Sequence, residues 1–186
     1  FDSDILHTGD SGCCSLDDAE DARSVARKLN MPFQVFNSKA DFAEKVIGDF
    51  IRCYEAGLTP NPCIQCNQHL KFGLLLDKAL ELGCDLLVTG HYARVCFDPS
   101  SSRYLLKKAV DAPKDQTYFL YTLSQAQLKH ICLPLGELTK EQVRQIAEAQ
   151  GFLNARKRDS QDICFIPDGD YYSFLCRHTG AGYPKG

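Results

Sequence analysis

Two cysteines, Cys63 and Cys66, form the pair of residues in this sequence best suited to covalent chemistry. They stand at the two ends of Cys63-Ile64-Gln65-Cys66, just before a predicted helix. The amino-terminal end of a helix favours a thiolate over a thiol, because the helix dipole and free backbone N–H groups stabilise negative charge. The pair could therefore provide a reactive cysteine, half of a zinc site, or two ordinary thiols.

The other cysteines do not complete a zinc site. Cys13 and Cys14 are adjacent, and the scattered ones include Cys53, Cys84, Cys96, Cys132 and Cys176. A structural zinc ion would need a second pair at a similar short spacing. Cys84, Cys96 and Cys132 occupy apolar settings, so we expect them to be core residues.

Cys164 is a third candidate for chemistry. It follows Asp159-Ser160-Gln161-Asp162 and enters a short β-like run. Arg156, Lys157 and Arg158 precede it, and nearby cations would stabilise its thiolate. The alternative is a cysteine in the core of a strand, preceded by solvated charges. Taken alone, the residues favour that alternative.

A polar loop could contact a nucleic acid. Asp111-Ala112-Pro113-Lys114-Asp115-Gln116 precedes the aromatic segment 117–121. Lys114 and Gln116 could contact phosphates and base edges while the aromatic side chains pack. The segment could equally be a solvated loop before a core strand.

His91 follows Thr89-Gly90 at the end of a predicted strand. The apolar run Leu86-Leu87-Val88 is typical of a buried parallel strand, and the carboxyl edge of such a sheet is where ligands bind. A single histidine at this place is more often a hydrogen-bonded structural residue than a catalyst.

The elements that position these residues alternate between helices and strands, as in α/β proteins. Periodicity predicts helices over residues 15–29, 39–56 and 70–82, and strands over residues 33–36, 86–88 and 104–107. Gly57 and Gly83 are placed to end two of the helices. Two Ser/Thr-x-x-Gln capping boxes predict further helices over residues 124–130 and 139–150.

The composition fits one globular domain, with 44% hydrophobic and 24% charged residues in a chain of 186. No apolar run approaches the roughly 20 residues that span a bilayer, and we expect a cytoplasmic protein. The ten cysteines are irregularly spaced, unlike a secreted disulfide scaffold. A net charge of −3 gives no global argument for nucleic-acid binding, so local basic clusters must carry that case.

Taken in order, several motifs closely resemble the tRNA-specific 2-thiouridylases, a family of PP-loop ATPases. The resemblance extends over nearly the whole chain, from Gly12-Cys13-Cys14-Ser15 to Phe174-Leu175. The motifs are Gly57-Leu58-Thr59-Pro60-Asn61-Pro62-Cys63-Ile64-Gln65-Cys66-Asn67, Lys71-Phe72, Thr89-Gly90-His91-Tyr92, Lys114-Asp115-Gln116, Phe119-Leu120 and Ser160-Gln161-Asp162-Ile163-Cys164-Phe165.

The resemblance implies an α/β fold: a partial PP-loop (adenine nucleotide alpha hydrolase-like) parallel sheet flanked by helices. It implies that ATP, with Mg²⁺, activates the C2 oxygen of the wobble uridine as an adenylate, and that a cysteine persulfide supplies the sulfur. The implied partners are tRNA and a sulfur-relay protein or cysteine desulfurase.

The same resemblance implies roles for individual residues. Cys66 is the nucleophile, Cys164 receives the persulfide, and Gly90 lies against the adenine nucleotide. Two further groups are implied to bind RNA: Asn61, Pro62 and Cys63 at the target base, and Lys114, Asp115 and Gln116 on the tRNA.

The chain departs from the family in two respects. Many family members have aspartate where this chain has Cys63, so an acid–base role cannot be carried over to that position. The family's Ser-Gly-Gly-x-Asp-Ser phosphate loop and its carboxyl-terminal β-barrel have no counterpart here. We therefore expect a truncated nucleotide-binding and thiolase domain over residues 1–166 and the start of a central domain over residues 167–186, inactive by itself.

Two alternatives use the same cysteines. Cys63, Cys66 and Cys164 could hold an iron–sulfur cluster through three thiolates, leaving one iron site open to bind sulfur. Alternatively, the chain is an inactive remnant or a small redox or metal-binding module that uses only the Cys63-Cys66 pair.

Overall fold

The computed structural model describes residues 16–152, 154–156, 163–180 and 182–183. The chain divides into two compact units, one made of Phe1–Asn37 and Gly151–Gly186 and the other of Ser38–Gln150. The expected boundary between residues 166 and 167 stays a prediction.

The larger unit opens with a helix over residues 39–55 that ends before Gly57. It consists of α2 (Lys39–Phe42), a π-helical segment (Ala43–Ile47) and α3 (Gly48–Glu55), and it buries Val46, Ile47 and Phe50. Gly57 stops the helix in the left-handed conformation, with φ of 72°. The sequence predicted this helix and its end correctly.

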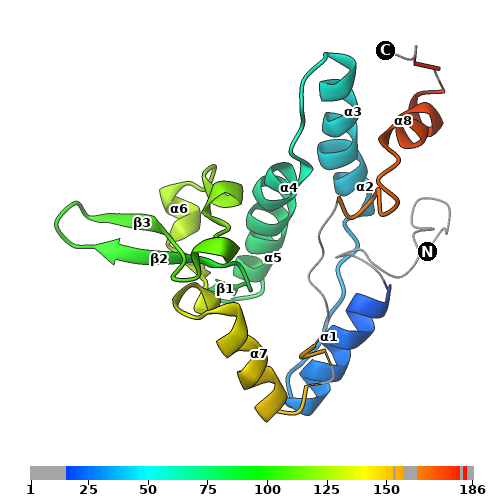
Figure 1. The fold of residues 1–186 in the computed structure, drawn as a ribbon. Helices are drawn as coiled ribbons and strands as arrows, with labels where there is room; N and C mark the ends of the chain where they lie inside the picture. Colours follow the sequence, from blue (N-terminus) through cyan, green and yellow to red (C-terminus); the bar gives the residue numbers. More distant parts are fainter. Residues whose placement is uncertain (1–15, 153, 157–162, 181, 184–186) are drawn as a thin grey trace. The chain divides into compact units, whose positions relative to one another are not determined.

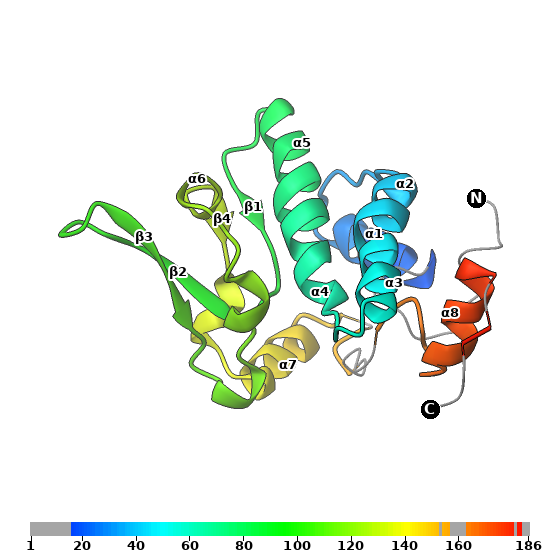
Figure 2. The same ribbon diagram turned by 90° about the horizontal axis from the view of Figure 1, so that it is seen from above.

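A second helix covers residues 62–81 and carries the cysteine pair. It consists of α4 (Pro62–Gln65), a π-helical segment (Cys66–Leu75) and α5 (Leu76–Glu81). Its buried residues include Ile64, Phe72 and Leu76. Figure 2 shows α4 and α5 beside α2 and α3, and residues of the two helices are in contact.

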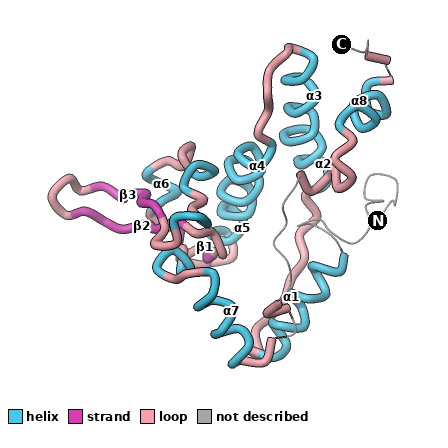
Figure 3. Tube along the Cα trace, in the orientation of Figure 1, coloured by secondary structure: helices cyan, strands magenta, loops and turns pink. Residues whose placement is uncertain are grey.

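In the described part of the chain, four short strands form two separate pairs. The longer pair, β2 with β3, is drawn in magenta in Figure 3. β1 (Leu87–Val88) runs parallel to β4 (Ile131–Cys132), with Leu87 opposite Ile131. β2 (Ala93–Asp98) and β3 (Arg103–Lys108) form an antiparallel hairpin, with Ala93 opposite Lys108. The parallel pair and its flanking helices confirm the expected α/β class, whereas β2 was not predicted.

One cluster of buried side chains joins these elements. Phe72 from the second helix meets residues of β2, β4 and the loops around them; its other buried members are Ala93, Leu120, Ile131 and Leu133. The carbonyl of Phe72 also accepts a hydrogen bond of 2.7 Å from Nε2 of Gln127. The second helix is thereby fixed to both strand pairs.

Both predicted capping boxes are present. Ser124 caps α6 (Gln125–Leu128) and Thr139 caps α7 (Lys140–Ala149), each with the reciprocal glutamine bond. Between them lies a 3-10 turn, Pro134–Glu137. Two more 3-10 turns, Ala112–Lys114 and Thr117–Leu120, occupy the expected polar loop and the aromatic segment after it.

The smaller unit contains α1 (Leu16–Lys28) and α8 (Tyr171–Thr179). α1 confirms the first predicted helix. Near α8, the ring of Phe165 packs against Phe174 with a centroid distance of 5.3 Å. None of the helices in the described ranges combines the length and apolarity that a membrane crossing requires.

Three expectations about local structure were wrong. Residues 33–36 form no strand, because neither strand pair of the described chain supplies a partner for their backbone groups. The β1 segment is not buried, since Val88 is 59% exposed. Cys84 is exposed, and Cys96 and Cys132 are only half-buried, so apolar neighbours in sequence did not make them core residues.

Gly136 allows the turn Pro134–Glu137 to lie directly against β2. A Cβ atom at this position would stand 1.9 Å from the carbonyl oxygen of Ala93 and 2.6 Å from its carbon. We expect Gly136→Ala to destabilise the protein by about 3 kcal/mol, because backbone rather than a mobile side chain must move. Urea unfolding measures this loss.

Gly48→Ala is the matched control for this substitution. Gly48 lies inside a helix, and a Cβ there would have the tip of Arg52 as its nearest neighbour at 3.3 Å. Helix propensity should leave its stability unchanged or raise it by about 0.5–1 kcal/mol. Equal stability of the two alanine variants would contradict the proposed backbone clash.

Candidate active site

A cavity of about 410 Å³ lies at the carboxyl end of β1. Its lining comes from the second helix, the end of β1 and the polar loop, and consists of Lys71, Leu75, Val88, Thr89, Gly90, His91 and Gln116. Ligand sites of small molecules fall in this size range. The cavity is therefore where the strand pattern predicted a ligand site.

Gly90 leaves one wall of this cavity open. A Cβ atom built on Gly90 would find only Leu135 within 4 Å, at 3.5 Å from its Cδ1. The residue is exposed. A ligand can therefore approach the Gly90 backbone beside the Leu135 side chain. Its place against the adenine nucleotide stays a prediction.

His91 is a buried structural residue on the same wall. It is 8% exposed, its Nδ1 lies 2.8 Å from Oγ1 of Thr89, and its ring centroid is 5.6 Å from that of Phe72. Burial, and secondly the charge of Lys71, lower the pKa of His91 from 6.5 to about 4. His91 is therefore neutral near pH 7.

The three residues expected to contact tRNA, Lys114, Asp115 and Gln116, have different surroundings in the loop. Lys114 is exposed. Asp115 uses Oδ1 inside the loop, where it accepts from the Ala109 N–H at 2.8 Å and from the Thr117 hydroxyl at 2.6 Å. Gln116 lines the cavity.

Gln116 is tied to Tyr92 by two hydrogen bonds. Its backbone N–H donates to the Tyr92 carbonyl at 2.8 Å, and its side-chain Oε1 accepts from the Tyr92 N–H at 2.9 Å. The amide is thereby held in one orientation on the cavity wall. Sequence reasoning placed Gln116 among RNA contacts and did not foresee this position.

The cysteine pair lies inside a helix and not before one, which corrects the sequence expectation. Asn61 caps the helix, with Oδ1 accepting from the Ile64 N–H at 3.3 Å, and buried Pro62 is its first residue. Cys63 is exposed in the first turn, whereas Cys66 is half-buried one turn later. Asn followed by Pro is a strong helix-start signal that the apolar periodicity concealed.

Asn67, directly after Cys66, is a buried polar residue at 4% exposure. Its amide Oδ1 has no hydrogen-bond partner within the described part of the chain. Buried amide oxygens usually have partners, so Asn67 is an exception in the turn of the helix that carries Cys66. Cys66 also begins the π-helical segment, a rare geometry that often lies at functional sites.

Cys164 belongs to the smaller unit and lies in a turn, not in the expected strand. It is half-buried beside Phe165 and Ile166, while residues 157–162 lie outside the described residues. Its pairing with Cys66 stays a prediction. Within the described ranges, no three His, Cys, Asp or Glu side chains are placed to hold a metal ion.

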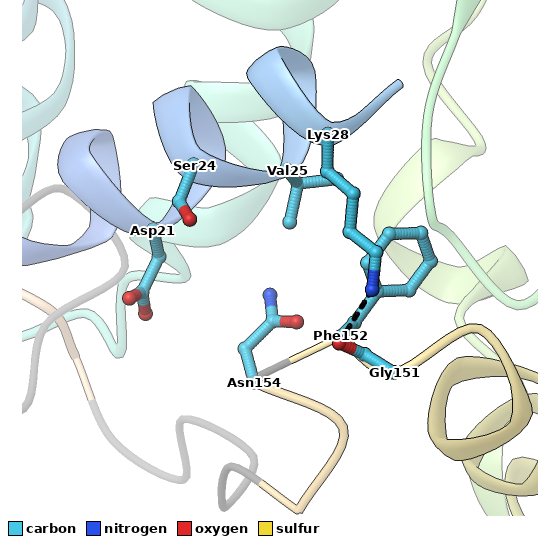
Figure 4. Close-up of a pocket in the computed structure, with 7 residues that line it drawn as sticks. All are labelled: Asp21, Ser24, Val25, Lys28, Gly151, Phe152 and Asn154. Carbon is cyan, nitrogen blue, oxygen red and sulfur yellow. Dashed lines mark hydrogen bonds between the residues drawn. The ribbon is translucent and has the colours of Figure 1, made fainter.

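A smaller cavity of about 110 Å³ lies in the smaller unit (Figure 4). Lys28 closes one side of it by donating from Nζ to the Gly151 carbonyl at 2.7 Å, with its charge 5.2 Å from the Phe152 ring centroid. Its volume is below that of usual small-molecule sites. Its other lining residues are Asp21, Ser24, Val25 and Asn154.

Residues 2–168 match the protein family described as tRNA methyl transferase HUP domain. The chain belongs to this family. Its HUP domain therefore has the PP-loop ATPase-like fold, which confirms the fold expected from the motifs.

Bacterial relatives named tRNA-specific 2-thiouridylase MnmA are similar over nearly all of the chain. The protein of Clostridioides difficile is 50% identical, with 96% of this chain and 49% of the relative covered. The relatives from Magnetococcus marinus and Acetivibrio thermocellus are 51% and 52% identical, over 92% and 91% of this chain and 48% and 47% of theirs. The chain spans about half the length of these relatives.

The lowered pKa of His91 predicts an acid-sensitive stability. Between pH 6.5 and about 4, the unfolded chain binds a proton at this residue that the folded HUP domain does not. Stability is thus fully present above pH 6.5 and falls as the pH decreases, by up to about 3 kcal/mol from this group. Urea unfolding of the protein and of His91→Gln across this range measures the difference.

Carboxylates titrate alike in both proteins, so the difference between the two pH profiles isolates His91. The wild-type profile should be steeper between pH 6.5 and 4. Parallel profiles would show that the histidine does not titrate as its burial requires.

Proposed function

We propose that the protein is a tRNA-uridine 2-sulfurtransferase, which replaces the C2 oxygen of the wobble uridine with sulfur. The similarity to proteins named tRNA-specific 2-thiouridylase, at about 50% identity over nine-tenths of the chain, carries this proposal. The family description refers to methyl transfer, but the cysteines at positions 66 and 164 suit sulfur chemistry.

ATP and Mg²⁺ would bind in the cavity at the carboxyl end of β1, with the adenine side against the open backbone of Gly90. ATP supplies the adenylate: the uridine C2 oxygen attacks the α-phosphorus and pyrophosphate leaves. The oxygen then departs as part of AMP when sulfur attacks C2. His91, neutral near pH 7, holds the Thr89 side chain and adds no charge to the cavity.

Cys164 would carry the sulfur as a persulfide, and Cys66 would act as the second thiol. In one route, the Cys66 thiolate attacks the inner sulfur, forms a disulfide and releases hydrosulfide, which attacks C2. In the other, the outer sulfur attacks C2 and Cys66 then displaces the thiolated base. Both routes end in a Cys66–Cys164 disulfide, since two thiols supply the two electrons, and a thiol reductant must restore the pair.

An iron–sulfur cluster held by Cys63, Cys66 and Cys164 is the alternative arrangement for the same reaction. The cysteine at position 63, where many family members have aspartate, favours it. Iron counting and visible absorbance after anaerobic reconstitution distinguish the cluster from a persulfide pair.

The RNA would approach from two places. Asn61, Pro62 and Cys63 would meet the target base, and Lys114 would contact the backbone. Asp115 and Gln116 would support that contact, because their side chains hold the loop and the cavity wall. A sulfur-relay protein or cysteine desulfurase would load Cys164, and the protein would work in the cytoplasm.

Serine at Cys66 or at Cys164 should abolish thiouridine formation, because each route needs both thiols. The assay gives the full-length gene product a persulfide donor, ATP and tRNA and counts thiouridine by mass spectrometry. Cys84→Ser, at an exposed cysteine, is the matched control and should keep wild-type activity. Full product from the Cys66 or Cys164 variant would overturn the assignment, and loss in Cys63→Ser as well would support the cluster.

Lys114→Ala should reduce the salt dependence of tRNA binding by about one phosphate contact, because the exposed side chain faces the RNA in this proposal. The measurement is the slope of log K against log salt concentration for the full-length gene product. Lys129→Ala, at another exposed lysine, should keep the wild-type slope. An unchanged slope in Lys114→Ala would reject the contact.

A further inference from the structure

Lys71 is a half-buried cation in the wall of the cavity at the carboxyl end of β1. No described residue accepts a hydrogen bond from its ammonium group or forms an ion pair with it. By contrast, Lys78 in α5 of the same helix forms an exposed ion pair with Glu81, with 3.0 Å between its Nζ and the carboxylate oxygen. A half-buried ammonium group with no partner in the described chain is available to an anionic ligand in the cavity.

The other polar groups of this wall are also donors. The lining contains no aspartate or glutamate. The Oε1 atom of Gln116 accepts a hydrogen bond from the Tyr92 N–H, so the two N–H groups of the same amide can donate to a ligand in the cavity. The cavity thus offers a positive charge and oriented N–H groups, the combination that binds phosphoryl oxygens.

The occupant must also fit the space. About 410 Å³ suits a nucleoside monophosphate and not a folded RNA strand. Gly90 provides an uncovered backbone on the same wall, suited to the flat face of a base. The cavity therefore offers the open backbone of Gly90 to a base and the ammonium group of Lys71 to an anionic group.

We propose that Lys71 and the Gln116 amide bind the α-phosphoryl group of the adenine nucleotide whose base lies against Gly90. This inference rests on the proposed function, because it takes the nucleotide from that reaction. Lys71 then contacts the phosphoryl group through which the uridine is activated and with which AMP departs.

The test compares two ligands that differ by one phosphoryl group, AMP and adenosine, on the full-length gene product. Lys71→Met should weaken AMP binding at least tenfold and leave adenosine binding within twofold. Lys71→Arg should restore most of the preference for AMP, because it keeps the charge. Lys78→Met, on the same helix, is the matched control and should bind both ligands like the wild type.

Gln116→Glu provides a second variant, and we expect it to fold because the substitution keeps the size of the side chain and its acceptor oxygen. Its carboxylate can still accept from the Tyr92 N–H, but it places negative charge in the cavity, so AMP binding should fall while adenosine binding stays within twofold. Melting temperatures of all variants establish that they are folded.

Unchanged AMP binding in Lys71→Met would overturn the inference, and if tRNA binding fell instead, the lysine would serve an RNA phosphate. A wild-type protein that binds neither ligand, or both equally, would also overturn it. A different result would contradict the proposed function alone. In that case the wild type would bind AMP more tightly than adenosine, Lys71→Met would lose this preference, and yet the wild type would form no thiouridine from tRNA, ATP and a persulfide donor.

Discussion

The packing of Phe72 fixes the geometry on which the candidate site depends. Its side chain is fully buried among residues of β2, β4 and the adjoining loops, and its carbonyl is held by Gln127. Lys71 precedes it on the helix, and Cys66 lies six residues earlier. Because Phe72 cannot turn out of the core without opening a large void, the helix keeps one rotation, and that rotation presents Lys71 to the end of β1.

The electrostatics of the cavity follow from the same arrangement. Burial keeps His91 neutral, so Lys71 is the one full charge on the described lining near pH 7. A histidine that was also protonated would repel the lysine and raise the cost of keeping both there. The described lining, with one cation and no carboxylate, therefore suits an anionic ligand.

Local signals in the sequence were enough to predict much of the fold. Gly57, Gly83 and the two capping boxes mark helix ends through interactions within a few residues, and the structure confirms them. The strand Ala93–Asp98 exists through its pairing with Arg103–Lys108, and the position of Gln116 depends on Tyr92, 24 residues away in the sequence. Such pairings are set by tertiary context, which single-residue preferences do not contain. The sequence therefore predicted the motifs of the site, but not that residues of three of them line one cavity.

The paired hydrogen bonds between Gln116 and Tyr92 have a thermodynamic consequence. The backbone N–H of Gln116 donates to the Tyr92 carbonyl, and its side-chain Oε1 accepts from the Tyr92 N–H. Because both bonds form within the chain itself, the amide is already ordered on the cavity wall. A ligand that uses its N–H groups therefore does not have to immobilise this side chain, which lowers the entropy cost of binding.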